Sequence, residues 1–281
     1  LGSKIEKTNF IRKRGSDFSI KDKLPKSTLL TPQILSLIAA MNHKKIPVYV
    51  KPTVAVISSG NELSEPGKKL KVNQVVASNN YGLSAMLEGF GASPEIFPLV
   101  PDDINSICKT LNEALSFDLV VTVGGASVGK YDLIRAAGKK LGLKVLFNSI
   151  AMRPGKPLMG GQIKETPLIA LPGNPVSALI CCEVVVQQVI RKMIGLKETY
   201  EKKYFAILQR PLSKNGVREH YMRATTKYKS GQIIIKAHDR QDSHLLRNLA
   251  DSNALLIRPP HDRDRYKGEL VPFIRILNYS D

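Results

Sequence analysis

The sequence contains no tryptophan, only three cysteines among 281 residues, and an aromatic content of 6%. An odd number of cysteines, two of them adjacent at Cys181 and Cys182, is unsuited to a disulfide framework, so we expect reduced thiols in a cytoplasmic setting. No apolar run reaches the roughly 18 residues of a membrane span, and no signal-peptide core opens the chain. We therefore expect neither a membrane partner nor secretion.

Acidic residues are also scarce. The chain has 42 basic and 24 acidic residues, for a formal net charge of +18. The excess lies mainly outside residues 53–194, which hold 14 basic and 11 acidic residues. Neither flank interleaves aromatic with basic residues, as a platform for single-stranded nucleic acid would. A nonspecific basic surface explains the charge more simply than a nucleic-acid partner does.

From residue 53 onward, apolar stretches of strand length alternate with helical patterns, which predicts a doubly wound α/β fold with a mostly parallel sheet and helices on both faces. The expected strands are TVAVISS (53–59), EIFPLV (95–100), FDLVVTV (117–123), KVLFNSI (144–150) and TPLIAL (166–171). The expected helices are NNYGLSAMLEGFG (79–91), DINSICKTLNEALS (103–116, capped by the Asp102–Asp103 pair), YDLIRAAGKKLG (131–142) and a long helix from Pro175 to about Ile194.

The last part of the sequence changes to short apolar stretches separated by Gly, Asn, Asp and Pro, which predicts a small all-β domain. Its expected strands are YFAILQ (204–209), HYMRATT (220–226), QIIIKA (232–237) and ALLIRPP (254–260). In the first part we expect one helix, TPQILSLIAAMN (31–42), capped by Thr31. The predicted domains are residues 1–52, 53–196 and 197–281.

One glycine-rich stretch resembles a nucleotide-binding loop. In VTVGGASVGKYDLI (121–134), Gly124, Gly129 and Lys130 reproduce G-x-x-x-x-G-K, but Tyr131 replaces the Ser or Thr whose hydroxyl would bind Mg²⁺. This mismatch argues against a nucleotide triphosphatase. Two interpretations stay open: an anion-binding turn at a helix N-terminus in which Asp132 takes the metal, or a tight turn without a ligand.

Three carboxylates follow three neighbouring strands of the predicted sheet. Glu62 follows the first strand, Asp102 the second and Asp132 the third. Ligands of open parallel sheets bind beyond the carboxyl ends of the strands, so these side chains are expected to converge there. Together with water and phosphate oxygens they would suit Mg²⁺. Taken singly, each has a simpler role, as a solvated residue, a helix cap or a first-turn acid.

Two further loops are expected at the same edge. MRPGKP (152–157) carries Arg153 and Lys156, which suit an oxyanion or phosphate. LPGNPVSA (171–178) is predicted to open a helix and so to offer a second anion site. A surface cation pair and an ordinary strand-to-helix turn are the simpler alternatives. We find no Ser, His and acid set for nucleophilic catalysis, and the five histidines lack metal-ligand spacing.

With SSGNEL, GGASVGKYD, MRPGKP and LPGNPVSA in this order, and DRQDSHLLRNLADSNALL further on, the sequence resembles the molybdopterin molybdenumtransferase family, which includes the E domain of gephyrin. The resemblance covers about residues 10–281. It implies insertion of molybdate into adenylated molybdopterin, with Mg²⁺-dependent release of AMP. It also implies catalytic and metal-binding roles for Glu62, Asp102 and Asp132. The substrate-binding positions that it implies are Gly124, Gly125, Ser127, Arg153, Lys156, Pro172, Gly173, Asn174, Pro175, Arg223 and Ser243.

The resemblance further implies a homodimer and names molybdopterin adenylyltransferase as a candidate partner. Residues 1–52 would be a remnant of the family's longer N-terminal region. Asn61 and Ala77 stand where the family usually has acids. These departures leave one alternative to an active enzyme, a module that binds molybdopterin without turnover. The likeness to gephyrin allows another, a scaffold whose basic flanks bind an acidic partner.

Overall fold

The computed structural model describes residues 13–24, 26–124, 133–197 and 203–276. The chain divides into two compact units, one made of residues 1–49 and 195–197 and the other of the remaining residues. In the first unit, α1 (Pro32–Ala40) begins at Thr31, whose side-chain oxygen accepts a hydrogen bond from the Ile34 N–H at 3.4 Å. The predicted helix and its cap are confirmed.

A six-stranded sheet in the order β4-β1-β5-β9-β8-β6 forms the centre of the second unit. Strands β4, β1, β5 and β9 are parallel, whereas β8 runs antiparallel to both of its neighbours, so the predicted mostly parallel sheet is confirmed. The strands are β1 (Thr53–Ser58), β4 (Ser93–Ile96), β5 (Leu119–Val123), β6 (Lys144–Phe147), β8 (Met159–Ile163) and β9 (Thr166–Leu171).

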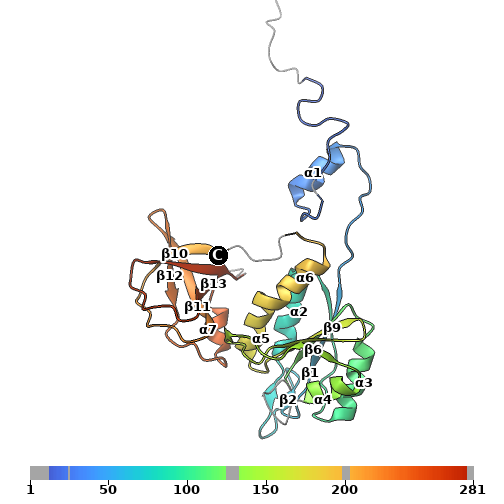
Figure 1. Cartoon of the computed structure of the whole chain (residues 1–281), viewed down its shortest axis with the longest axis vertical. Helices are drawn as coiled ribbons and strands as arrows, with labels where there is room; N and C mark the ends of the chain where they lie inside the picture. Colours follow the sequence, from blue (N-terminus) through green and yellow to red (C-terminus); the bar gives the residue numbers. More distant parts are fainter. Residues whose placement is uncertain (1–12, 25, 125–132, 198–202, 277–281) are drawn as a thin grey trace, which may run out of the picture. The chain divides into compact units, whose positions relative to one another are not determined.

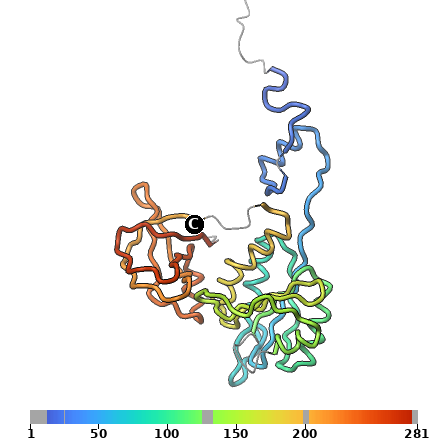
Figure 2. The backbone as a smooth tube through the Cα atoms, viewed as in Figure 1, coloured from blue at the N-terminus to red at the C-terminus, as the bar shows by residue number. Residues whose placement is uncertain are grey.

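Helices cover both faces of this sheet, as predicted (Figures 1 and 2). On one face, Val54 and Val56 pack with α2, α5 and the segments that continue α5; on the other, Ala55 and Ile57 pack with α3 and α4. Successive side chains of β1 point to opposite faces, and both faces are buried. This explains why the sequence of β1 is one continuous apolar run. The helices are α2 (Asn79–Gly89), α3 (Ile104–Ala114), α4 (Leu133–Lys140), α5 (Pro175–Cys181), the π-helix η1 (Cys182–Val186) and α6 (Gln187–Met193).

The C-terminal residues form a second, all-β sheet, which confirms the predicted small β domain. Its order is β12-β10-β14-β13-β11, and an additional pairing of β12 with β11 closes it. The strands are β10 (Tyr204–Leu208), β11 (Glu219–Lys229), β12 (Gln232–Ala237), β13 (Ala254–Arg258) and β14 (Leu270–Arg275), and α7 (Leu246–Ala250) lies between β12 and β13. The predicted domain boundaries stay a proposal.

A short strand from the chain segment between β6 and β8 adds to the edge of the second sheet. β7 (Met152–Arg153) pairs in parallel with Glu219 and His220 of β11. Apolar residues of both sheets also share one core. It contains Tyr221 and Leu255 of the closed sheet together with Val176 and Cys181 of α5. The closed sheet is therefore fixed against α5, the helix that follows β9.

Two further findings concern the composition. Cys108, Cys181 and Cys182 are free thiols, as predicted, and the last two are buried. Among the described residues, no helix combines the length and apolar character needed to cross a bilayer.

Candidate functional site

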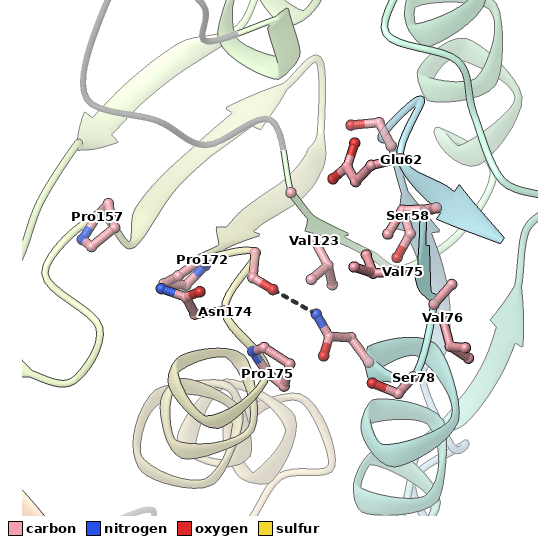
Figure 3. A pocket seen from close by; sticks show the side chains of 16 residues that line it. Ser58, Glu62, Val75, Val76, Ser78, Val123, Pro157, Pro172, Asn174 and Pro175 are labelled. Atoms are coloured by element: carbon pink, nitrogen blue, oxygen red, sulfur yellow. Dashed lines mark hydrogen bonds between the residues drawn. The ribbon is translucent and has the colours of Figure 1, made fainter. Parts of the chain in front are cut away.

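A pocket of about 630 Å³ lies beyond the carboxyl ends of β1, β5 and β9, where the topology predicted a ligand crevice (Figure 3). One side is formed by the end of β1 and by the short paired strands β2 (Leu63–Ser64) and β3 (Val75–Val76). The other side is the turn between β9 and α5. The lining residues are Ser58, Ser59, Glu62, Leu63, Val75, Val76, Ala77, Ser78, Asn79, Val123, Gly124, Pro157, Pro172, Gly173, Asn174 and Pro175.

Among the described residues, Glu62 supplies the acidic group of this lining. Its backbone carbonyl accepts a hydrogen bond from the Val75 N–H at 2.8 Å, which ties the residue to β3. Its side chain is exposed and lies across the pocket from Pro172 and Asn174 (Figure 3). The carboxylate is therefore available to a ligand or a metal.

Asp102 is held next to Glu62 through Asn61. The Asn61 N–H donates to Asp102 Oδ2 at 3.2 Å, and the Asp102 N–H donates to Asn61 Oδ1 at 3.1 Å. Asp102 does not itself line the pocket. Asn61, whose lack of charge was noted in the sequence, thus connects two of the predicted acids and leaves one Asp102 oxygen outside this pair of bonds.

The third predicted acid, Asp132, lies outside the described residues, as do Gly125 and Ser127. Within the described ranges, no group of three or more His, Cys, Asp or Glu side chains is placed to hold a metal ion. Glu62 and Asp102 are nevertheless exposed oxygen donors on adjoining segments. Two such carboxylates fit Mg²⁺, which commonly takes one or two from the protein and completes its shell with water and phosphate oxygens.

Gly124 closes the pocket at the end of β5, in a conformation that requires glycine. Its φ is +85°, and a Cβ at this position would lie 2.6 Å from the Ser59 carbonyl oxygen. A Cβ on Gly173 would lie 3.5 Å from the Gly124 Cα, so the two glycine turns nearly touch. Side chains are thereby excluded from the floor between them.

The turn between β9 and α5 forms the opposite wall. The Asn79 side-chain amide of α2 donates to the Gly173 carbonyl at 2.9 Å, the bond drawn as a dashed line in Figure 3. Pro175 has no N–H, and the Val176 N–H is used by the Ser243 carbonyl at 3.2 Å. The helix N-terminus that the sequence offered as a second anion site therefore has two fewer free donors than an ordinary one.

The loop that carries Arg153 and Lys156 is folded back on itself. The Ile150 N–H donates to the Lys156 carbonyl at 3.0 Å, and the Leu158 N–H donates to the Gly155 carbonyl at 3.1 Å. The Arg153–Pro154 peptide bond is cis. Both cationic side chains are exposed. The sequence predicted a cationic loop here, and the structure adds its strand pairing with β11.

Arginines of β7 and β11, and Arg218 just before β11, lie near His220. Burial, and after it the nearby positive charges, among them those of Arg153, Arg223 and Arg218, together lower the pKa of His220 to about 3. None of these three arginines forms a salt bridge with a carboxylate in the described parts of the chain. The neutral imidazole thus sits in a positive field that would attract an oxyanion.

Of the remaining predicted positions, Arg223 is buried, at 1% exposure, and Ser243 is half-buried. Neither lines the pocket. Arg223 belongs to the cluster around His220, and Ser243 touches α5 through its carbonyl. Sequence reasoning missed Arg218, because nothing in its local pattern indicates that β11 pairs with β7.

Comparisons with known proteins agree with this architecture. Residues 55–192 match the family model of a probable molybdopterin binding domain, and residues 206–276 match that of the MoeA C-terminal region (domain IV). Molybdopterin molybdenumtransferase 2 of Mycobacterium tuberculosis is 33% identical over 256 residues, covering 89% of this chain and 63% of the relative. Molybdopterin molybdenumtransferase of Haemophilus influenzae is 34% identical over 274 residues, covering 95% and 68%.

The crystal structure of a molybdopterin biosynthesis moeA protein from Pyrococcus horikoshii superposes with a TM-score of 0.74 at 28% identity, covering 90% of this chain and 61% of that one. The chain thus spans about three fifths of the length of several proteins it matches. Its two sheets correspond to the two matched regions.

Proposed function

Since the chain belongs to the molybdopterin molybdenumtransferase family, we propose that it inserts molybdate into adenylated molybdopterin with Mg²⁺-dependent release of AMP. One observation carries it: a large pocket with a carboxylate on one wall adjoins the loop of Arg153 and Lys156, which form no salt bridge within the described residues.

This separation of charge suits a reaction between a phosphoanhydride and an oxyanion. We assign Glu62 and Asp102, together with Asp132, to Mg²⁺ and to cleavage of the anhydride. When bound, Mg²⁺ would polarise a phosphoryl oxygen of the adenylyl group. Arg153, Lys156 and Arg223 are assigned to molybdate, whose charge the cluster around His220 would attract.

The remaining assignments concern shape. The close approach of Gly124 and Gly173 leaves the pocket floor open to a bulky ligand. Pro172 and Pro175 stiffen the opposite wall, since each fixes its own φ. The proposed substrate-binding residues of this group are Gly124, Gly125, Ser127, Pro172, Gly173, Asn174, Pro175 and Ser243.

The test measures AMP release from adenylated molybdopterin, with Mg²⁺ and molybdate each present or omitted. We expect release only when both are present. Glu62→Gln should reduce it by at least about tenfold, because the variant keeps the side-chain shape and loses the charge that would bind the metal. Glu165→Gln, in the exposed turn between β8 and β9, is the matched control. Undiminished release by Glu62→Gln would remove Glu62 from the proposed machinery.

A module that binds molybdopterin without turnover is the second candidate function. It is favoured by the neutral residues at Asn61, which bonds to Asp102, and at Ala77, which is 5% exposed and lines the pocket. Such a module would bind the adenylated pterin and release no AMP under any of the four conditions. Equilibrium binding of the same substrate, measured beside AMP release, separates the two functions.

We further propose a homodimer that works in the cytoplasm and receives its substrate from molybdopterin adenylyltransferase. These proposals rest on the family, whose substrate is an adenylated pterin. A pull-down with molybdopterin adenylyltransferase as bait tests the partner. The recovery of this chain is compared with that of an unrelated protein of the same net charge. Equal recovery of both would attribute the binding to the net charge of +18.

A further inference from the structure

The side chain of Gln241 lies in the turn between β12 and α7 and connects this turn to Arg223 of β11. Its Oε1 accepts hydrogen bonds from the Arg223 backbone N–H at 2.9 Å and from Arg223 Nε at 3.1 Å. Its Nε2 donates to the Arg223 carbonyl at 3.0 Å and to the His238 carbonyl at 2.8 Å. One amide therefore uses its whole hydrogen-bonding capacity on two residues.

These contacts orient a buried cation. Arg223 also donates from Nη1 to the Asp242 carbonyl at 2.8 Å, so its guanidinium is held at two points. Burial lowers the pKa of Arg223, opposed by the nearby charge of Asp242. In the described residues, Nη2 is the guanidinium nitrogen without a hydrogen bond. Burial and these two contacts fix the orientation of the guanidinium.

The same turn reaches the pocket wall. Ser243 directly follows the carbonyl that Arg223 binds, and its own carbonyl accepts the Val176 N–H at 3.2 Å. Val176 is the second residue of α5 and follows Pro175, which lines the pocket. The backbone at Asp242 and Ser243 therefore connects the closed sheet to the wall of the pocket.

We propose that Gln241 is a positioning residue, which orients Arg223 toward the oxyanion and holds the Asp242–Ser243 backbone against the start of α5. The role in turnover rests on the proposed function, whereas the connection to α5 does not. Gln241 touches neither the pocket nor, in this assignment, the substrate. It acts on Arg223 through its side-chain hydrogen bonds, and on Val176 through the adjoining Asp242–Ser243 backbone.

Amide hydrogen exchange tests the connection directly. Gln241→Met keeps the length of the side chain and loses all four bonds, so the Val176 amide should exchange about tenfold faster, the effect of losing roughly one net hydrogen bond. Amides of β13, which pair within the closed sheet, should be unchanged. Gln232→Met, at the exposed start of β12, is the matched control and should leave Val176 as in the parent protein.

Gln241→Glu separates the two halves of the role. A carboxylate can still accept from both Arg223 donors but cannot donate to the Arg223 and His238 carbonyls, and it pairs the guanidinium with a negative charge. We expect the molybdate concentration for half-maximal AMP release to rise by about tenfold or more in this variant, because Arg223 would be neutralised. The maximal rate should change much less.

Three results would overturn the inference. Unchanged exchange at Val176 in Gln241→Met would show that the turn does not hold α5. Equally faster amide exchange at Val176 and throughout β13 would mean that Gln241 stabilises the whole fold and has no specific effect on α5. An unchanged molybdate dependence in Gln241→Glu would remove its action on Arg223. Absence of AMP release from the parent protein would contradict the proposed function instead, and the exchange measurement would still decide the connection to α5.

Discussion

At the scale of single residues, two glycines with nearly the same φ angle provide a matched pair. Gly124 and Gly67 have φ values of +85° and +84°, but a Cβ on Gly67 would meet nothing within 4 Å, whereas one on Gly124 would meet the Ser59 carbonyl at 2.6 Å. Gly67→Ala should lower the free energy of unfolding by ~1 kcal/mol through backbone strain alone. Gly124→Ala should lower it clearly more, as measured by urea unfolding.

The difference between the two variants isolates the close approach at the pocket floor. If both alanine variants lose the same stability, the contact between Gly124 and Ser59 carries no energetic penalty. Circular dichroism of each variant before unfolding checks that the comparison is made between folded proteins.

His220 gives a prediction about acid stability. Its pKa is about 3 in the folded protein, against 6.5 for an unperturbed imidazole. Above pH 6.5 the residue is neutral in both states and contributes no pH dependence. As pH falls from 6.5 toward 3, only the unfolded chain takes up the proton, so the fold loses ~1.4 kcal/mol per pH unit from this group.

His220→Gln should abolish that contribution, so its unfolding free energy should fall less than that of the parent between about pH 6.5 and about pH 4. His43→Gln is the control, because His43 is exposed. Denaturant unfolding across this range provides the measurement. Parallel curves for the parent and His220→Gln would contradict a neutral, buried imidazole at this position.

Several residues of the site were predictable because their positions follow from strand ends. Gly124 directly follows an apolar run, Glu62 comes a few residues after another, and parallel strands end at one edge. Arg218 and Gln241 were not predictable. Arg218 donates to the Met152 carbonyl across 66 residues of sequence, and Gln241 acts on a residue 18 positions away. No local pattern specifies contacts of that kind.

At the scale of elements, the adjacent acids Asp102 and Asp103 have separate tasks. Asp103 caps α3, accepting from the Asn105 and Ser106 N–H groups at 2.9 and 3.1 Å. Asp103→Ala should lower the melting temperature, because it exposes two unpaired donors, and should leave AMP release nearly unchanged. Asp102→Asn should lower AMP release and leave the melting temperature nearly unchanged.

Thermal unfolding and AMP release, measured on both variants, check this division of labour. A large loss of activity in Asp103→Ala at a temperature where the variant is fully folded would mean that the cap also serves the site. The sequence predicted the pair as a cap, and the structure assigns the cap to Asp103 alone.

The elements missed from the sequence lack local signals. β8 pairs with β9 through a turn at Lys164 and Glu165, and Lys164 adopts a φ of +52° without the Gly or Asn that usually marks such a turn. β14 includes Pro272, which argues against a strand in the interior of a sheet. β4 begins at Ser93, two residues before the predicted strand, because it pairs with β1 from Thr53 onward.

At the scale of the whole molecule, the proposed homodimer can be tested by mass. Sedimentation in about 0.15 M salt, where the repulsion from a net charge of +18 is screened, should give twice the 31.0 kDa of one chain. The doubled mass should persist on moderate dilution if the interface is a stable one. A single species of 31.0 kDa at every concentration would contradict the proposal.

The parallel pairing of Met152–Arg153 with Glu219–His220 also bears on the order in which the protein becomes functional during synthesis. The strands and helices of the first sheet are complete before the ribosome has made β11, so that sheet can form while the Arg153 loop still lacks its partner. At roughly 5–20 residues per second, several seconds separate the two segments. A nascent chain stalled before Glu219 would therefore carry the strands of the first sheet without the pairing that fixes the Arg153 loop, which we propose to bind molybdate.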